Sequence, residues 1–134
     1  MAIDTAKAVA NGACYDGDVW DLFDGKGENT EVLPLGTVVT IPAAGSEMSN
    51  SSVITREEDL CKRGRNTPLN FPKFSILNPE FTYTLPPFQT ACGVVDIMAH
   101  MMERYFTRVT HVELIDRMTE GALKTVVGNA PIVM

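Results

Sequence analysis

The stretch at residues 89–103 reads QTACGVVDIMAHMME, and its apolar residues recur at helical spacing. Asp96 and His100 are four residues apart, so a helix places them on one face with Cβ atoms about 5–6 Å apart. A carboxylate oxygen and an imidazole nitrogen at this spacing can bind one divalent ion, and this ligand pair suits iron(II) or zinc. Gly93 lies one turn before Asp96 and leaves room beside the pair. The stretch therefore predicts a helix that carries a candidate metal site.

The same spacing also fits a simple hydrogen-bonded pair, and spacing alone favours that interpretation. The neighbouring side chains shift the balance, because they predict burial on most sides of the helix, and a buried Asp needs a partner or a cation. These apolar neighbours are Val94, Val95, Ile97, Met98, Met101, Met102, Tyr105 and Phe106. The methionines are most simply core residues.

Composition places the chain among ordinary globular proteins, with 45% hydrophobic and 21% charged residues. The net charge of −6 argues against nucleic acid or an anionic membrane as a partner. No apolar run approaches the roughly 20 residues that span a bilayer. The three cysteines share no metal-ligand spacing and follow no signal peptide, so we expect reduced thiols in a cytoplasmic protein.

Upstream of the metal stretch, the pattern alternates between helix and strand. Residues 2–10 form an Ala-rich helical pattern that ends near Asn11 and Gly12. β-Branched and apolar runs predict short strands at residues 37–41, 52–55 and 73–77. The polar, turn-rich segments between them predict loops at residues 13–31 and 56–70. The first loop holds a short apolar cluster, Val19, Trp20, Leu22 and Phe23.

After Pro86 and Pro87 the pattern becomes helical, first to residue 106 and then again over residues 113–127. His111 precedes the second helix and is most simply a solvated helix start. The chain is therefore predicted to be α/β followed by all-α, with the boundary near residue 86.

Residues 38–49, VVTIPAAGSEMS, form a second candidate site. A strand that ends in small residues lets a ligand approach the backbone, and Thr40, Ser46 and Ser49 can donate hydrogen bonds. Open α/β sheets bind nucleotides at such turns, although any tight turn shares this composition. A basic group could meet a phosphate or form a solvated loop; it comprises Lys62, Arg63, Arg65 and Lys73.

Five segments in order resemble the iron-containing (group III) alcohol dehydrogenases, in the branch of NAD(P)H-dependent butanol dehydrogenases and aldehyde reductases. The resemblance runs over essentially the whole chain. The segments are IDTAK at 3–7, TIPAAGSEM at 40–48, PKFSILNP at 72–79, TYTLPP at 82–87 and GVVDIMAH at 93–100.

This resemblance implies a fold and an activity. Residues 1–86 would form the C-terminal part of a Rossmann-like dinucleotide-binding domain, and residues 87–134 the start of a helical metal-binding domain of the dehydroquinate synthase-like fold. The family interconverts primary alcohols and aldehydes with NAD or NADP and a metal, Fe²⁺ or Zn²⁺, which polarises the substrate oxygen. A homo-oligomer, a dimer, is the expected assembly.

The resemblance also implies roles for single residues. Asp96 and His100 would be the first two of four metal ligands, with no separate catalytic side chain. Five positions would line the dinucleotide: Thr40, Ala44, Ser49, Lys62 and Thr84. Lys62 would lie near the ribose and nicotinamide, and Ala44 replaces the threonine usual in the family.

We expect the chain to be an internal fragment, because the family's GGGS phosphate loop and its last two histidine ligands fall outside it. Two further possibilities remain open: a catalytically inactive remnant that self-associates through exposed helix faces, and a small standalone metal- or nucleotide-binding module.

Overall fold

The computed structural model describes residues 2–134, and the chain divides into two compact units. The first unit comprises the residues up to Val39 together with Gly45–Asn78. The second comprises Thr40–Ala44 and Pro79–Met134. Compact units need not coincide with family domains, so the domain ranges 1–86 and 87–134 stay predictions.

Two helices belong to the first unit, α1 over Ala2–Gly12 and α2 over Val19–Asp24. The first confirms the predicted helix. The second contradicts the loop predicted at residues 13–31, and its cause is local. Asp18 accepts a hydrogen bond from the Trp20 amide at the N-terminus, and Gly25 ends the helix in the left-handed region at φ 72°.

Four strands pair into two small two-stranded sheets. β1 (Gly36–Val38) pairs in parallel with β4 (Phe74–Ile76), and β2 (Ser51–Arg56) pairs antiparallel with β3 (Cys61–Asn66). The predicted loop at 56–70 is therefore wrong over β3, where ladder bonds to β2 outweigh the polar composition. Short 3₁₀ turns complete the connections: η1 at Ser46–Met48, η2 at Pro68–Asn70 and η3 at Pro79–Thr82.

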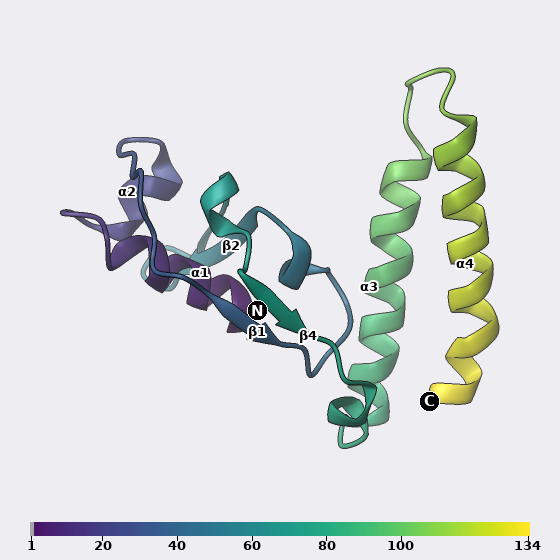
Figure 1. The fold of residues 1–134 in the computed structure, drawn as a ribbon. Helices are drawn as coiled ribbons and strands as arrows, with labels where there is room; N and C mark the ends of the chain where they lie inside the picture. The colour runs from purple at the N-terminus through teal and green to yellow at the C-terminus, as the bar shows by residue number, and fades with distance from the viewer. Residues whose placement is uncertain (1) are drawn as a thin grey trace. The chain divides into compact units, whose positions relative to one another are not determined.

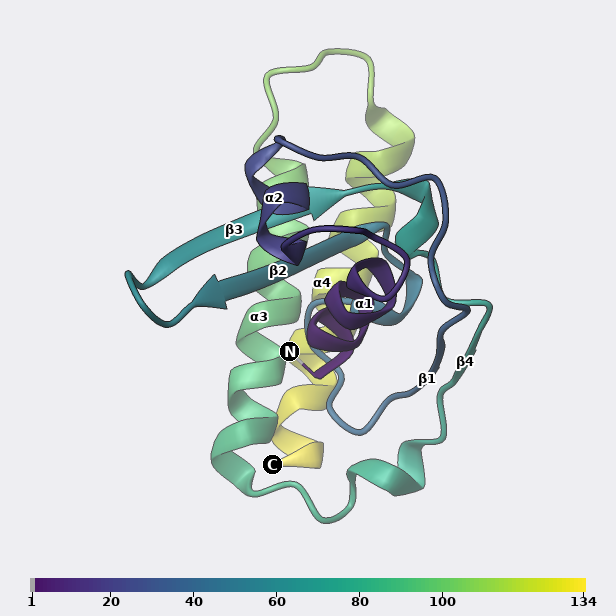
Figure 2. The same cartoon turned by 90° about the vertical axis from the view of Figure 1, so that its left-hand side faces the viewer.

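The core of the first unit forms where the two helices pack on the β2–β3 hairpin (Figure 2). Its buried apolar residues are Ala8, Trp20, Leu22 and Phe23, with Ile54 and Cys61 packed against them. Arg56 lies over the Trp20 ring, with its guanidinium carbon 4.7 Å from the ring centroid. The apolar cluster noted in the sequence is thus the centre of this core.

The second unit is a helical hairpin of α3 (Pro87–Tyr105) and α4 (Glu113–Val133), which run antiparallel side by side (Figure 1). Both predicted helices are confirmed, although α4 continues through Pro131 to Val133. The Tyr105 hydroxyl joins the two helices by donating to Glu120 Oε1 at 2.9 Å.

Side chains of α3 are far less buried than their apolar composition predicted. Among the residues described in this unit only Gly93 is buried, and the Val95 side chain is 65% exposed. The prediction of burial on most sides is wrong, because α4 covers one side of α3 and only short segments meet the rest. No helix among residues 2–134 combines the length and apolarity needed to cross a membrane.

Candidate metal and dinucleotide sites

Asp96 and His100 lie on one face of α3, as their spacing predicted. His100 Nε2 is 3.9 Å from Asp96 Oδ1, and the two side chains are 48% and 45% exposed. That distance is longer than an N–H···O hydrogen bond, so this geometry does not favour the hydrogen-bonded pair. Glu103 Oε2 lies 3.7 Å from the other ring nitrogen of His100, Nδ1.

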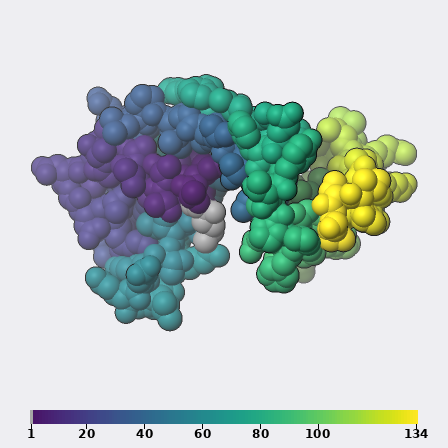
Figure 3. Space-filling view, turned by 90° about the horizontal axis from the view of Figure 1, so that it is seen from below, coloured from purple at the N-terminus to yellow at the C-terminus, as the bar shows by residue number. Residues whose placement is uncertain are grey.

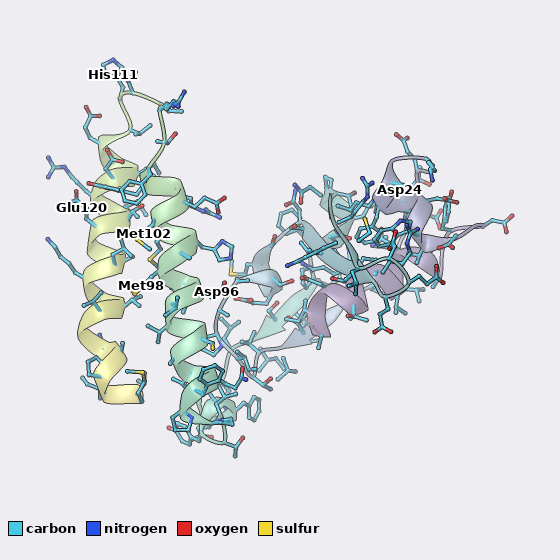
Figure 4. All side chains as sticks on the ribbon, turned by 180° about the vertical axis from the view of Figure 1, so that it is seen from behind. Asp24, Asp96, Met98, Met102, His111 and Glu120 are labelled. Carbon is cyan, nitrogen blue, oxygen red and sulfur yellow. The ribbon has the colours of Figure 1, made fainter. Side chains whose placement is uncertain are left out.

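The pair lies on a different side of α3 from the contact with α4. Figure 4 shows Met98 and Met102 between the two helices and Asp96 on the opposite side of α3. A carboxylate oxygen and an imidazole nitrogen on an accessible face fit two positions of an iron or zinc ligand shell. Within residues 2–134, no three His, Cys, Asp or Glu side chains gather closely enough to hold a metal ion.

Gly93 serves a different purpose from the one expected. A Cβ atom at this position would lie 2.5 Å from the Pro42 carbonyl oxygen. The Pro42 carbonyl therefore occupies the space that Gly93 leaves open on α3. Pro42 belongs to the candidate dinucleotide segment at residues 38–49. This segment therefore contacts α3 about one turn before Asp96.

An apolar pocket of about 580 Å³ lies in the second unit. It is lined by Ile41 and Pro42, by α3 from Gln89 to Ile97, and by the end of α4. Figure 3 shows that end of α4 in yellow beside α3 in green. Neither Asp96 nor His100 lines the pocket, so it is separate from the metal pair.

The five predicted dinucleotide positions divide between the two units. Thr40, Ala44 and Thr84 lie in exposed bends and turns of the second unit, whereas Ser49 and Lys62 belong to the first. Ser49 is half-buried, and its hydroxyl oxygen accepts from the Ser51 amide at 3.0 Å. The dinucleotide role of all five residues stays a prediction.

The basic group splits into separate environments, because successive residues of β3 point to opposite faces. Arg63 forms an ion pair with Asp24 at 3.0 Å, and Arg65 donates to Asn29 Oδ1 at 2.7 Å. Lys62, which alternates with them, is exposed on the other face. Lys62, Arg63 and Arg65 therefore belong to a strand and not to a solvated loop, whereas Lys73 directly precedes β4.

Lys7 lies in the IDTAK segment of the resemblance, but the sequence assigned no role to it. It is 1% exposed, and its ammonium donates to the carbonyl oxygens of Ser46, Ser49 and Ser51 at 2.7–2.8 Å. Burial lowers its pKa, against the raising effect of Asp4 and Glu47. Asp4 and Lys7 both lie in the IDTAK segment, but their spacing gives no sign of hydrogen bonds to a turn about forty residues away.

His111, expected as a solvated helix start, is exposed with φ 64° and lies just before α4. Cys14, Cys61 and Cys92 form no disulfide with one another in the part of the chain that the structure describes.

Comparison with known proteins now identifies the family. The family model of iron-containing alcohol dehydrogenases matches residues 1–79, more than half of the chain. The probable NADH-dependent butanol dehydrogenase 1 of Bacillus subtilis is 50% identical over 129 residues, which are 96% of this chain and 33% of that protein. The NADPH-dependent aldehyde reductase YqhD of Escherichia coli is 36% identical over 132 residues, covering 96% of this chain and 34% of that protein.

The solved structures agree with these relatives. The crystal structure of NADH-dependent butanol dehydrogenase A from Thermotoga maritima matches with a TM-score of 0.93 and 40% identity, over 98% of this chain and 33% of that chain. The predicted fold class, an α/β part followed by helices, is confirmed. The chain spans about a third of the length of the relatives that it matches. It belongs to the iron-containing alcohol dehydrogenase family.

Proposed function

We propose that this chain is part of an NAD(P)(H)-dependent dehydrogenase that interconverts primary alcohols and aldehydes with a bound metal, iron(II) or zinc. The observation that carries the proposal is the Asp96–His100 pair, two accessible donors on one face of α3 in a family of metal-dependent dehydrogenases. The relatives' names support alcohols and aldehydes as the substrate class. One of these relatives is NADH-dependent and the other is NADPH-dependent, so the proposal includes both cofactors.

The residues of this chain would do two things. Asp96 and His100 would supply an oxygen and a nitrogen ligand, and Glu103 near His100 Nδ1 would orient the imidazole. Dinucleotide contacts would come from the predicted positions, with Lys62 nearest the ribose and nicotinamide. The bound metal supplies Lewis-acid polarisation of the substrate oxygen.

A chimera tests the proposal, because it supplies the two thirds of the enzyme that this chain does not match. The corresponding third of the Bacillus subtilis relative is replaced by residues 1–134, and NADH- and NADPH-dependent reduction of butanal is measured together with metal content. We expect activity, and a loss of about 100-fold or more in kcat with reduced metal content in Asp96→Ala or His100→Ala.

Glu113→Ala, an exposed carboxylate at the start of α4, is the matched control and should keep both properties. A chimera that is active and keeps its metal and activity after Asp96→Ala would refute the ligand assignment.

The isolated 134-residue chain is a separate matter, and we propose that it behaves as an inactive, self-associating fragment. Its second unit leaves large apolar side chains in water, with Phe88 74%, Leu114 70% and Ile132 78% exposed. We expect dimers or larger species in sedimentation equilibrium, no butanal reduction, and weak iron binding.

Leu114 and Met118 lie one turn apart and are both exposed, so Leu114→Lys with Met118→Lys should shift the chain toward monomer. A chain that stays monomeric at high concentration contradicts self-association. NAD(P)H-dependent butanal reduction by the isolated chain, lost in Asp96→Ala, contradicts inactivity.

A further inference from the structure

Lys7 is the largest fully buried side chain of the first unit. A buried ammonium is costly unless it is fully hydrogen-bonded. Besides the three carbonyl oxygens already described, Lys7 Nζ donates to Ser46 Oγ at 3.1 Å. An ammonium has three protons, and four acceptors share them. No donor remains for a bound ligand, so Lys7 is neither a phosphate contact nor an accessible base.

The acceptors all come from one short segment, the turn of residues 45–51. α1 holds this turn through a second residue as well, because Asp4 Oδ1 accepts from the Ser46 hydroxyl at 2.5 Å. The Asp4 carbonyl accepts from the Ser52 hydroxyl at 2.9 Å. The Asp4 carboxylate therefore accepts a hydrogen bond from this turn, while the Lys7 ammonium donates hydrogen bonds to it.

The turn is also held from the β1–β4 sheet. Ser75 Oγ donates to the Glu47 carbonyl at 2.8 Å and accepts from Thr37 Oγ1 at 2.8 Å. Gly45 adopts φ 71°, which lets the chain enter the turn at low cost. Removing Lys7 would leave three inward-pointing carbonyls without their donor, so the turn should lose its shape first.

We propose that Lys7 is a positioning residue, which fixes the backbone of residues 45–51 so that Ser49 faces the dinucleotide. The role of Ser49 in this proposal rests on the proposed function. The role of Lys7 in fixing the turn rests only on the hydrogen bonds of Lys7. Lys7 acts through this backbone and touches no cofactor.

The test compares Lys7→Met with Lys124→Met in the 134-residue chain. Lys124 is an exposed lysine of α4, so the same substitution there controls for the change in charge. We expect hydrogen exchange at the Met48, Ser49 and Ser51 amides to accelerate about tenfold or more in Lys7→Met and to stay unchanged in Lys124→Met.

The unmodified chain provides a second readout that does not depend on a variant folding. An ammonium held by fixed acceptors exchanges its protons slowly and gives a resolved ¹H–¹⁵N signal, which should be present for Lys7 at neutral pH and absent for exposed lysines. Absence of this signal, or unchanged amide exchange in a folded Lys7→Met, overturns the proposal. Should Lys7→Met not fold, Ser46→Ala removes one shared hydroxyl and must still accelerate exchange of the same amides.

Millimolar NADH separates the two layers of the argument. In the butanol dehydrogenase chimera described under the proposed function, we expect it to shift the Ser49 amide resonance, and to do so less when Lys7→Met is present. Faster exchange in Lys7→Met combined with no NADH effect on Ser49 in the active chimera would refute the dinucleotide role of Ser49 and with it the cofactor purpose of Lys7, while leaving Lys7 as the anchor of the turn.

Discussion

The two units of this chain differ in how far they bury their side chains. The first buries apolar and polar groups together, with Trp20, Leu22 and Phe23 in the core and Lys7, Asn11 and Asn70 fully hydrogen-bonded beside it. In the second, Gly93 is the only buried residue among those described, and large apolar side chains lie in water. Tertiary packing therefore determines the details of the first unit, whereas in the second unit local helix geometry determines most of them and the Gly93–Pro42 contact is the exception.

This difference explains why the candidate sites are not equally predictable. The metal pair depends on a four-residue spacing along one helix, which needs no partner from elsewhere in the chain. The turn at residues 45–51 depends on Lys7 and Asp4, about forty positions away in the sequence. A local pattern reveals the first arrangement and cannot reveal the second.

The same leucine substitution in each unit tests the contrast most directly. Leu22 is 3% exposed and Leu114 is 70% exposed. Leu22→Ala should lower the free energy of unfolding by about 2–5 kcal/mol, because it leaves a cavity. Leu114→Ala should change it by no more than about 0.5 kcal/mol. Urea unfolding followed by Trp20 fluorescence and by circular dichroism measures both, and equal losses would break the comparison.

A pair of glycine substitutions sharpens the comparison inside the second unit. Gly93→Ala places a Cβ 2.5 Å from the Pro42 oxygen, a backbone atom, so we expect a loss of about 1–3 kcal/mol. Gly121 has open space in the middle of α4, so Gly121→Ala should stabilise the helix by about 0.5–1 kcal/mol. Thermal unfolding followed by helical circular dichroism distinguishes them. Stabilisation by both would mean that residues 40–44 do not rest on α3.

The smallest expected effect is electrostatic and lies at the exposed end of the β2–β3 hairpin. The Arg56 guanidinium donates to Asp59 and lowers the pKa of that carboxyl to about 2. Because the folded pKa is depressed, its stabilising contribution is present above the ordinary value of 3.8 and is lost as the pH falls toward 2. A carboxyl NMR titration should find this midpoint, and Arg56→Ala should return it toward 3.8. A midpoint already near 3.8 in the unmodified chain would show that the pair does not form.

Much of the fold followed from local patterns. The Ala-rich start predicted α1, the two apolar periodic stretches predicted α3 and α4, and the β-branched run at 52–55 predicted β2. Two elements did not follow. β3 is polar in composition and forms because β2 pairs with it, and α2 is a single short helix made by its caps and by burial of Trp20.

The sequence by itself determined the family, the helical spacing of Asp96 and His100, and the order of an α/β part before a helical pair, because all three lie in local motifs. Tertiary structure alone decided that Gly93 receives the Pro42 carbonyl, that Lys62 is separated from Arg63 and Arg65, and that Lys7 holds the turn carrying Ser49. The physical reason is that hydrogen bonds and close contacts between distant segments form only when the chain folds. The spacing of residues within one segment does not predict which distant residue each of them will contact.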